Sequence, residues 1–167
     1  MSSSVAEKRG ARLGKWPALG VSLALVVATA ATGGAFPPGE WYAGLTKPSF
    51  NPPSWVFGPA WTYLYATMAI AAWLVWLRRD RPRAGPALGT YLATLVLNAA
   101  WMPLFFGVHW MGIAFAEIVL LDLCILACVV LFWPISRVAS LLMVPYAAWV
   151  TFAATLNFWL WRLNPGA

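Results

Sequence analysis

Charged residues are scarce in this sequence. Asp, Glu, Lys and Arg together make up 10% of its 167 residues, and 62% of the residues are hydrophobic. A soluble domain carries about 25% charged residues, because its surface has to face water. This composition excludes an ordinary soluble domain and predicts that lipid surrounds most of the chain.

The residues that carry most catalytic and metal chemistry are also few. The one histidine, His109, lies in a short GVH turn and is expected to be a turn residue. The two cysteines, Cys124 and Cys128, have no third ligand nearby, so we expect small buried side chains rather than a metal site. No glycine-rich phosphate loop and no HExxH motif occurs. We therefore expect no metal and no required cofactor.

Five apolar stretches are each long enough to cross a bilayer of about 30 Å as a helix. They are Trp16–Phe36, Pro59–Leu77, Ala87–Phe106, Trp110–Trp133 and Val138–Trp161. Backbone groups in hydrocarbon must be paired internally, which favours helices, and the stretches lack the alternation of a membrane barrel. Because the later links are short, the sequence predicts an all-α membrane protein, a five-transmembrane-helix bundle. It forms one domain over residues 16–164, with a long structured loop between its first two helices and a basic N-terminal tail at residues 1–15.

The basic residues are distributed unevenly between the two sides of this bundle. Lys47 and Arg162 are on one side. Nine are on the other: Lys8, Arg9, Arg12, Lys15, Arg78, Arg79, Arg81, Arg83 and Arg137. The positive-inside rule then places the N-terminus in the cytoplasm, and long apolar helices favour the inner membrane of a bacterial cell over the outer one. Contact with anionic lipid, rather than nucleic acid, is the expected role of these charges. The first stretch also begins like a signal peptide, but it continues through Phe36, which favours a retained span.

The first loop combines proline with aromatic residues. The segment WYAGLTKPSFNPPSWVFGPAW, from Trp41 to Trp61, holds six aromatic residues, four prolines and a single charge, Lys47. Four prolines so close together are incompatible with a helix, and disordered linkers are poor in aromatic residues. We expect a stiff, non-helical lid that rests on the mouth of the bundle.

The third span has two opposed faces. A stripe of small residues, where another backbone can approach closely, recurs every four positions at Gly85, Gly89 and Ala93. The opposite face carries polar and aromatic residues, among them Asn98 and Trp101. The stripe either contacts a second copy of the chain or packs inside the bundle, and the opposition of the two faces favours a homodimer.

Aromatic residues with hydrogen-bonding tips also share faces in other spans. Trp61 and Tyr65 lie one turn apart in the second span. The fifth span presents Tyr146, Trp149, Ala153 and Asn157 on one face. Such faces, turned toward a bundle interior, predict an apolar, aromatic-walled pocket for a flat hydrophobic ligand.

Two acids lie in the fourth span, where a carboxylate is costly and is a functional hypothesis by default. Glu117 is near the end of the span and is expected to reach the interface or to pair with His109 or Lys47. Asp122 is deeper. A proton relay needs a longer chain of such groups, so ion coupling is the less favoured interpretation.

Three segments resemble the TspO/MBR family, also called tryptophan-rich sensory proteins or translocator proteins. They are WYAGLTKPSFNPPSWVFGPAWTYLY (41–65), LNAAWMPLFFG (97–107) and VPYAAWVTFAATLNFWLWRLN (144–164). The resemblance implies five transmembrane helices, often as a homodimer, with a pocket closed by the first loop. It implies porphyrins such as protoporphyrin IX and haem as ligands, together with benzodiazepine-type drugs, and a role in tetrapyrrole or stress regulation. Two alternatives remain: light-dependent breakdown of porphyrin, and a dimeric regulator that acts through a protein partner.

The resemblance and the helix faces together give a set of predicted ligand contacts. They are Trp41, Tyr42, Pro52, Trp55, Trp61, Tyr65, Asn98, Trp101, Tyr146, Trp149, Ala153 and Asn157. Within this set, Trp61 and Trp149 match the two tryptophans that the family associates with porphyrin photochemistry.

Overall fold

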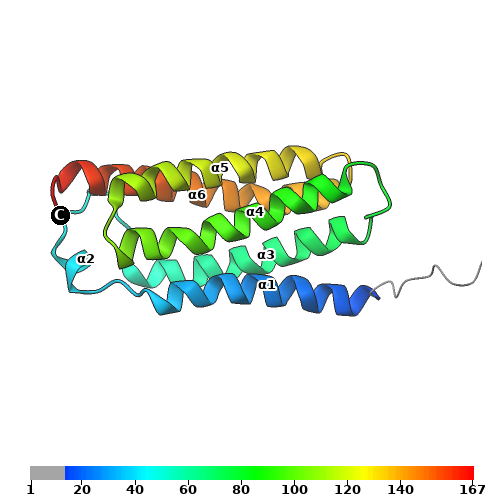
Figure 1. Ribbon diagram of the computed structural model, residues 1–167, viewed down its shortest axis with the longest axis horizontal. Helices are drawn as coiled ribbons and strands as arrows, with labels where there is room; N and C mark the ends of the chain where they lie inside the picture. The colour runs from blue at the N-terminus through cyan, green and yellow to red at the C-terminus, as the bar shows by residue number, and fades with distance from the viewer. Residues whose placement is uncertain (1–13) are drawn as a thin grey trace, which may run out of the picture.

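A computed structural model describes residues 14–167, and over that range the protein contains helices but no strand (Figure 1). Predicted features of residues 1–13, including three of the nine basic residues, lie outside the described part. The long helices are α1 (Lys15–Ala35), α3 (Phe57–Trp76), α4 (Ala84–Met102), α5 (Met111–Phe132) and α6 (Arg137–Leu163). Three short elements join them: α2 (Glu40–Gly44), the 3₁₀ turn η1 (Ser54–Val56) and the π-helical turn η2 (Pro103–Gly107).

The ends of the long helices follow local chemistry. Ser136 caps α6 by accepting a hydrogen bond from the backbone N–H of Ala139. Pro59 falls in the first turn of α3, where the N–H that proline lacks would have no helical partner. Pro145 is tolerated inside α6, as prolines are in membrane helices. The bounds of each long helix agree with those of its predicted stretch to within a few residues.

Within residues 14–167, four segments are apolar and long enough to cross a membrane: α1, α4 together with η2, α5 and α6. Helix α3 is not among them, because its tryptophan and tyrosine residues lower its mean hydropathy. The predicted all-helical membrane architecture is confirmed at this level, with at least four candidate spans.

The five long helices form a closed ring. Helix α1 packs against α3 and α4, α3 packs against α6, α6 against α5, and α5 against α4. Figure 1 shows them running along the long axis, with α2 and the C-terminus at one end and the start of α1 at the other. The first loop therefore covers one end of the ring.

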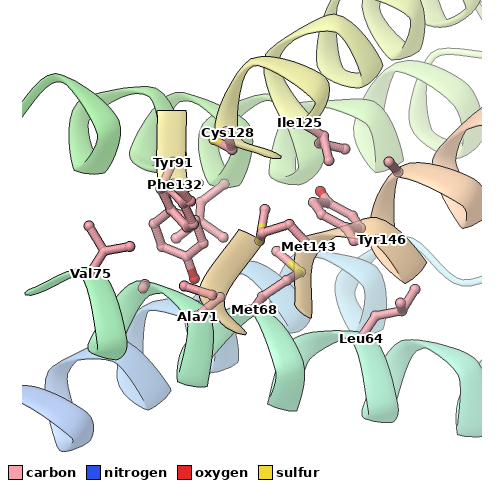
Figure 2. Packing of buried hydrophobic residues seen from close by; sticks show 14 of the residues in the cluster. Leu64, Met68, Ala71, Val75, Tyr91, Ile125, Cys128, Phe132, Met143 and Tyr146 are labelled. Carbon is pink, nitrogen blue, oxygen red and sulfur yellow. The ribbon is translucent and has the colours of Figure 1, made fainter. Parts of the chain in front are cut away.

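The core fills the ring with aliphatic, sulfur-containing and aromatic side chains (Figure 2). Met68 of α3, Ile125 and Cys128 of α5, and Met143 and Tyr146 of α6 have no exposed surface. A second buried cluster at the loop end contains Leu45, Phe105, Met111, Ala114, Leu156 and Leu160. Leu45 belongs to the loop, so the loop is packed on the bundle rather than extended from it.

The prediction of a wholly non-helical loop from Trp41 to Trp61 is wrong for both of its ends, since Phe57–Trp61 is already part of α3. Glu40–Gly44 forms the short helix α2, because all four prolines of the predicted loop follow this stretch. The region from Leu45 to Pro53, which contains Pro48, Pro52 and Pro53, has no regular helix.

Candidate functional site

A chain of hydrogen bonds joins three helices inside the bundle. The Tyr65 hydroxyl of α3 donates to Oδ1 of Asn98 in α4 over 3.0 Å, and Nδ2 of Asn98 donates to the Tyr146 hydroxyl of α6 over 2.9 Å. Asn98 is 6% exposed and Tyr146 is fully buried. Trp61 completes the cluster: it stacks on Tyr65 at a centroid distance of 5.3 Å and meets Tyr146 edge-on at 6.3 Å. Four predicted contacts therefore come together, and the polar tips of Tyr65, Asn98 and Tyr146 bond to one another.

A second polar contact lies nearer the loop end. Nε1 of Trp101 donates to Oδ1 of Asn157 over 3.1 Å, and Nδ2 of Asn157 donates to the backbone carbonyl of Met111 over 2.9 Å. Trp101 also stacks on Phe105 at 4.9 Å. Because Asn157 is 1% exposed, its amide needs these partners. The pair fixes the end of α4 and the start of α5 against α6.

Trp149 lies beside an open apolar depression between α3, α6 and the loop. Its ring contacts Phe57 edge-on at 5.9 Å and Phe152 at 5.7 Å. The depression has a volume of about 490 Å³ and is largely open to the surface. It is lined by Pro52, Ala60, Tyr63, Leu64, Pro145, Ala148, Trp149 and Phe152. Two of its lining residues, Leu64 and Pro145, are next in sequence to Tyr65 and Tyr146 of the hydrogen-bonded cluster.

The inner surface of the loop rests on η2 and the turn before α5. Trp41 stacks face to face on His109, with centroids 3.9 Å apart and planes 10° apart. His109 adopts a φ of 60°, a left-handed conformation that few residues other than glycine take. Tyr42 meets Phe106 edge-on at 5.4 Å. Its hydroxyl donates to Asn51 over 3.2 Å, and burial raises the pKa of Tyr42 above its ordinary value.

Two polar residues hold the loop in shape. Lys47 Nζ donates to the backbone carbonyls of Tyr42, Ala43 and Leu45, at 2.7, 3.1 and 3.2 Å. Asn164, just after α6, bonds both backbone groups of Thr46: it accepts from the N–H at 2.8 Å and donates to the carbonyl at 2.9 Å. The loop is thus tied to the last helix through main-chain atoms.

Some predicted residues do not join these clusters. Trp55 is 73% exposed and points away from the bundle, although it belongs to the same loop as Trp41. Ala153 is half-buried and packs against the main core. The small-residue stripe of α4, Gly85, Gly89 and Ala93, is exposed, so it does not pack inside the bundle.

The predicted pairing of Glu117 is wrong among the described residues. Lys47 is engaged by loop carbonyls and His109 by Trp41, while the buried carboxylate oxygens of Glu117 have no recorded partner. Asp122 is linked to α6, because its Oδ2 accepts a hydrogen bond from the Thr151 hydroxyl over 2.8 Å.

Sequence reasoning missed several residues of the site. Neither His109 nor Asn164 was expected to contact the loop, because both contacts link distant parts of the chain. Phe57 and Phe152, which flank Trp149, were also missed. The one available signal was their spacing: Phe152 follows Trp149 by three residues, which places both on one helix face.

Comparison with known proteins adds an independent line of evidence. Residues 21–162 match the TspO/MBR family. Protein CrtK of Rhodobacter capsulatus is 44% identical over 137 residues, which cover 81% of this chain and 86% of the relative. The translocator protein of Homo sapiens is 42% identical over 155 residues (90% and 91%). The tryptophan-rich sensory protein of Cereibacter sphaeroides is 41% identical over 149 residues (89% and 92%).

Proposed function

The chain belongs to the TspO/MBR family of membrane proteins, and from that premise we propose that it binds porphyrins and related flat hydrophobic molecules as a receptor or transporter. The observation that carries the proposal is the grouping of tryptophans with polar tips. Trp61 lies against the Tyr65–Asn98–Tyr146 chain, and Trp149 lines the adjacent depression. A planar macrocycle offers two faces for such indoles.

The ligand has two neighbouring surfaces available to it. The depression supplies an apolar wall that includes Trp149 and Pro52, and it is open on one side. The interior cluster supplies hydroxyl and amide groups, which are bonded to one another in this closed arrangement. Entry of a polar edge of the ligand would exchange those internal bonds for bonds to the ligand. The loop, tied down by Asn164, covers the same end of the bundle.

This proposal is tested by titrating the protein with protoporphyrin IX and measuring the quenching of its tryptophan fluorescence. We expect Trp61→Phe and Trp149→Phe each to weaken binding by about two- to tenfold, the value of one aromatic stacking contact. Trp133→Phe is the matched control, since Trp133 is an exposed tryptophan of the opposite end. Wild-type affinity in both pocket variants would show that the pocket is wrongly assigned.

The membrane arrangement is part of the same proposal. All five long helices cross the inner membrane of a bacterial cell, with the N-terminus in the cytoplasm and the loop on the far side. The charges support this orientation, because Arg78, Arg79, Arg81 and Arg83 follow α3 at the end opposite the loop. Cysteines introduced at Arg83 and Ser49 should react with a membrane-impermeant thiol reagent from opposite sides. Labelling of both from one side would contradict five spans.

Light- and oxygen-dependent breakdown of porphyrin is a second candidate function. The contacts of Trp61 with two tyrosines favour it, since an excited porphyrin can oxidise an indole and the neighbouring phenols can share the electron loss. This activity is tested by irradiating the complex and measuring how fast the porphyrin absorption band decreases. Equal bleaching of free and bound porphyrin would reject it.

A third candidate is a dimeric regulator that acts through a protein partner. It is favoured by the exposed small-residue stripe of α4, where a second helix could approach closely. Gly89→Leu should separate the dimer without disturbing the fold, because Gly89 is exposed and a Cβ added there meets no atom within 4 Å. An unchanged oligomeric state of the variant in detergent would reject this interface.

A further inference from the structure

The end of the bundle opposite the loop carries a second depression. It lies where α1 begins and α3 ends, at the right of Figure 1, and its volume is about 490 Å³. It is lined by Gly14, Lys15, Trp76, Leu77, Arg79 and Asp80. Unlike the depression beside Trp149, it combines charged residues with an aromatic and an aliphatic wall.

The start of α1 is fixed at the rim of this depression. Nε1 of Trp73 in α3 donates to the backbone carbonyl of Lys15 over 2.9 Å. The rings of Trp16 and Trp73 stack at a centroid distance of 6.4 Å. These contacts position the backbone of Lys15 beside the end of α3, and Lys15 as a whole residue is exposed.

Arg79 is held in place on the other side. Its guanidinium carbon lies 3.9 Å from the ring centre of Trp76, and one N–H donates to the Trp76 carbonyl over 3.3 Å. A guanidinium fixed against an indole loses little freedom when it binds an anion, and its planar donors suit phosphate oxygens. Lys15 and Arg79 are therefore two cations at one preformed hollow.

We propose that this depression binds the phosphodiester group of an anionic membrane phospholipid. Among the described residues, the lining carries two cations, Lys15 and Arg79, and one carboxylate, Asp80. The planar donors of Arg79 and the ammonium group of Lys15 suit the anionic oxygens of a phosphodiester. Trp76 and Leu77 offer apolar surface to the glycerol and the first acyl carbons, as aromatic residues do at membrane interfaces. The inference depends on the membrane placement proposed above, but not on the porphyrin site.

Other basic residues at this end have different roles. Arg81 donates to the carbonyls of Pro134 and Ile135, which ties the α3–α4 connection to the α5–α6 turn. Arg137 lies 5.5 Å from the ring centre of Trp133. Neither residue lines the depression. Arg137 is therefore a control that carries the same charge at the same end of the bundle.

Native mass spectrometry of the full chain in neutral detergent tests the proposal, with phosphatidylglycerol and phosphatidylcholine as the two probes. We expect phosphatidylglycerol to bind more tightly, and Lys15→Gln and Arg79→Gln each to reduce its affinity about fivefold, the value of one interfacial cation. Arg137→Gln should change the affinity less than twofold. Arg79→Lys keeps the charge and should retain part of the affinity.

Three results would overturn the proposal. Equal losses in Arg137→Gln and Arg79→Gln would indicate diffuse attraction instead of a site. Wild-type lipid affinity in both Lys15→Gln and Arg79→Gln would exclude the depression. Competition by inorganic phosphate at equal concentration would indicate a free-phosphate site. Protoporphyrin IX binding, measured on the same variants, should be unchanged, so failure of the lipid site and failure of the porphyrin site are distinguishable.

Discussion

Asn98→Leu is the substitution that most directly tests the interior of the bundle. Leucine is close to asparagine in size but has no polar group, so it removes both bonds of the Tyr65–Asn98–Tyr146 chain and leaves little empty space. The variant keeps both tyrosine hydroxyls, and each loses its partner. The cost therefore reports the unpaired hydroxyls more than lost packing.

The magnitude follows from the burial of the two tyrosines. Tyr146 has no exposed surface, whereas Tyr65 is half-buried. The Tyr146 hydroxyl accepts its hydrogen bond from Nδ2 of Asn98. An unpaired buried hydroxyl costs about 1–3 kcal/mol, but single hydrogen bonds inside membrane proteins average about 0.6 kcal/mol. We expect Asn98→Leu to lower the free energy of unfolding by about 1–4 kcal/mol.

Reversible unfolding in mixed micelles, with increasing fractions of a denaturing detergent, measures this free energy. The triple variant that adds Tyr65→Phe and Tyr146→Phe has no unpaired hydroxyl, so it should recover most of the stability lost in Asn98→Leu. The reasoning is refuted if Asn98→Leu lies within about 0.5 kcal/mol of the wild type. It is also refuted if the triple variant is no more stable than Asn98→Leu alone.

Three further predictions concern the loop and the helix packing. Asn164→Ala removes both bonds to the main chain of Thr46, so amide exchange in the loop should accelerate about fivefold or more, and unchanged exchange would show that the clamp is unimportant. Gly112→Leu places its Cβ 3.1 Å from the Trp161 indole and should destabilise the protein by about 1–3 kcal/mol in thermal unfolding. Gly20→Leu should not, because a Cβ added at Gly20 meets nothing within 4 Å. Tyr42 has its pKa raised in the folded protein, so its contribution to loop stability is complete below about pH 10 and is lost as pH rises through the higher folded pKa. Absorbance titration of Tyr42→Phe against the wild type would locate this ionisation, and a wild-type midpoint at the ordinary value would contradict it.

Helix positions were predictable because length and apolar composition determine them. The opposed faces of α4 followed from 100° per residue, and the structure buries Asn98 while it exposes Gly89. Which side chains meet Asn98 was not predictable, since the rotation and tilt of α3 and α6 decide whether Tyr65 and Tyr146 reach it. Sequence patterns give a face of a helix, not the partner opposite that face.

The side-chain directions in the loop were even less predictable from the sequence. Trp41 and Trp55 belong to the same aromatic loop, yet one stacks on His109 and the other is 73% exposed. Their directions depend on α2, on η1 and on the backbone between them, and no periodicity describes such a segment. The left-handed conformation of His109 was equally hidden, because glycine is the residue that normally signals it.

The bond between Thr46 and Asn164 has a consequence for biosynthesis. The two residues are 118 positions apart, so at about 5–20 residues per second the ribosome makes Asn164 roughly 6–24 s after Thr46. Throughout that interval the loop lacks its clamp, although α1 and then α3 are already available to the membrane. The loop therefore gains this clamp only after α6 has been made, so its bonds to Asn164 are among the last contacts that the chain can form.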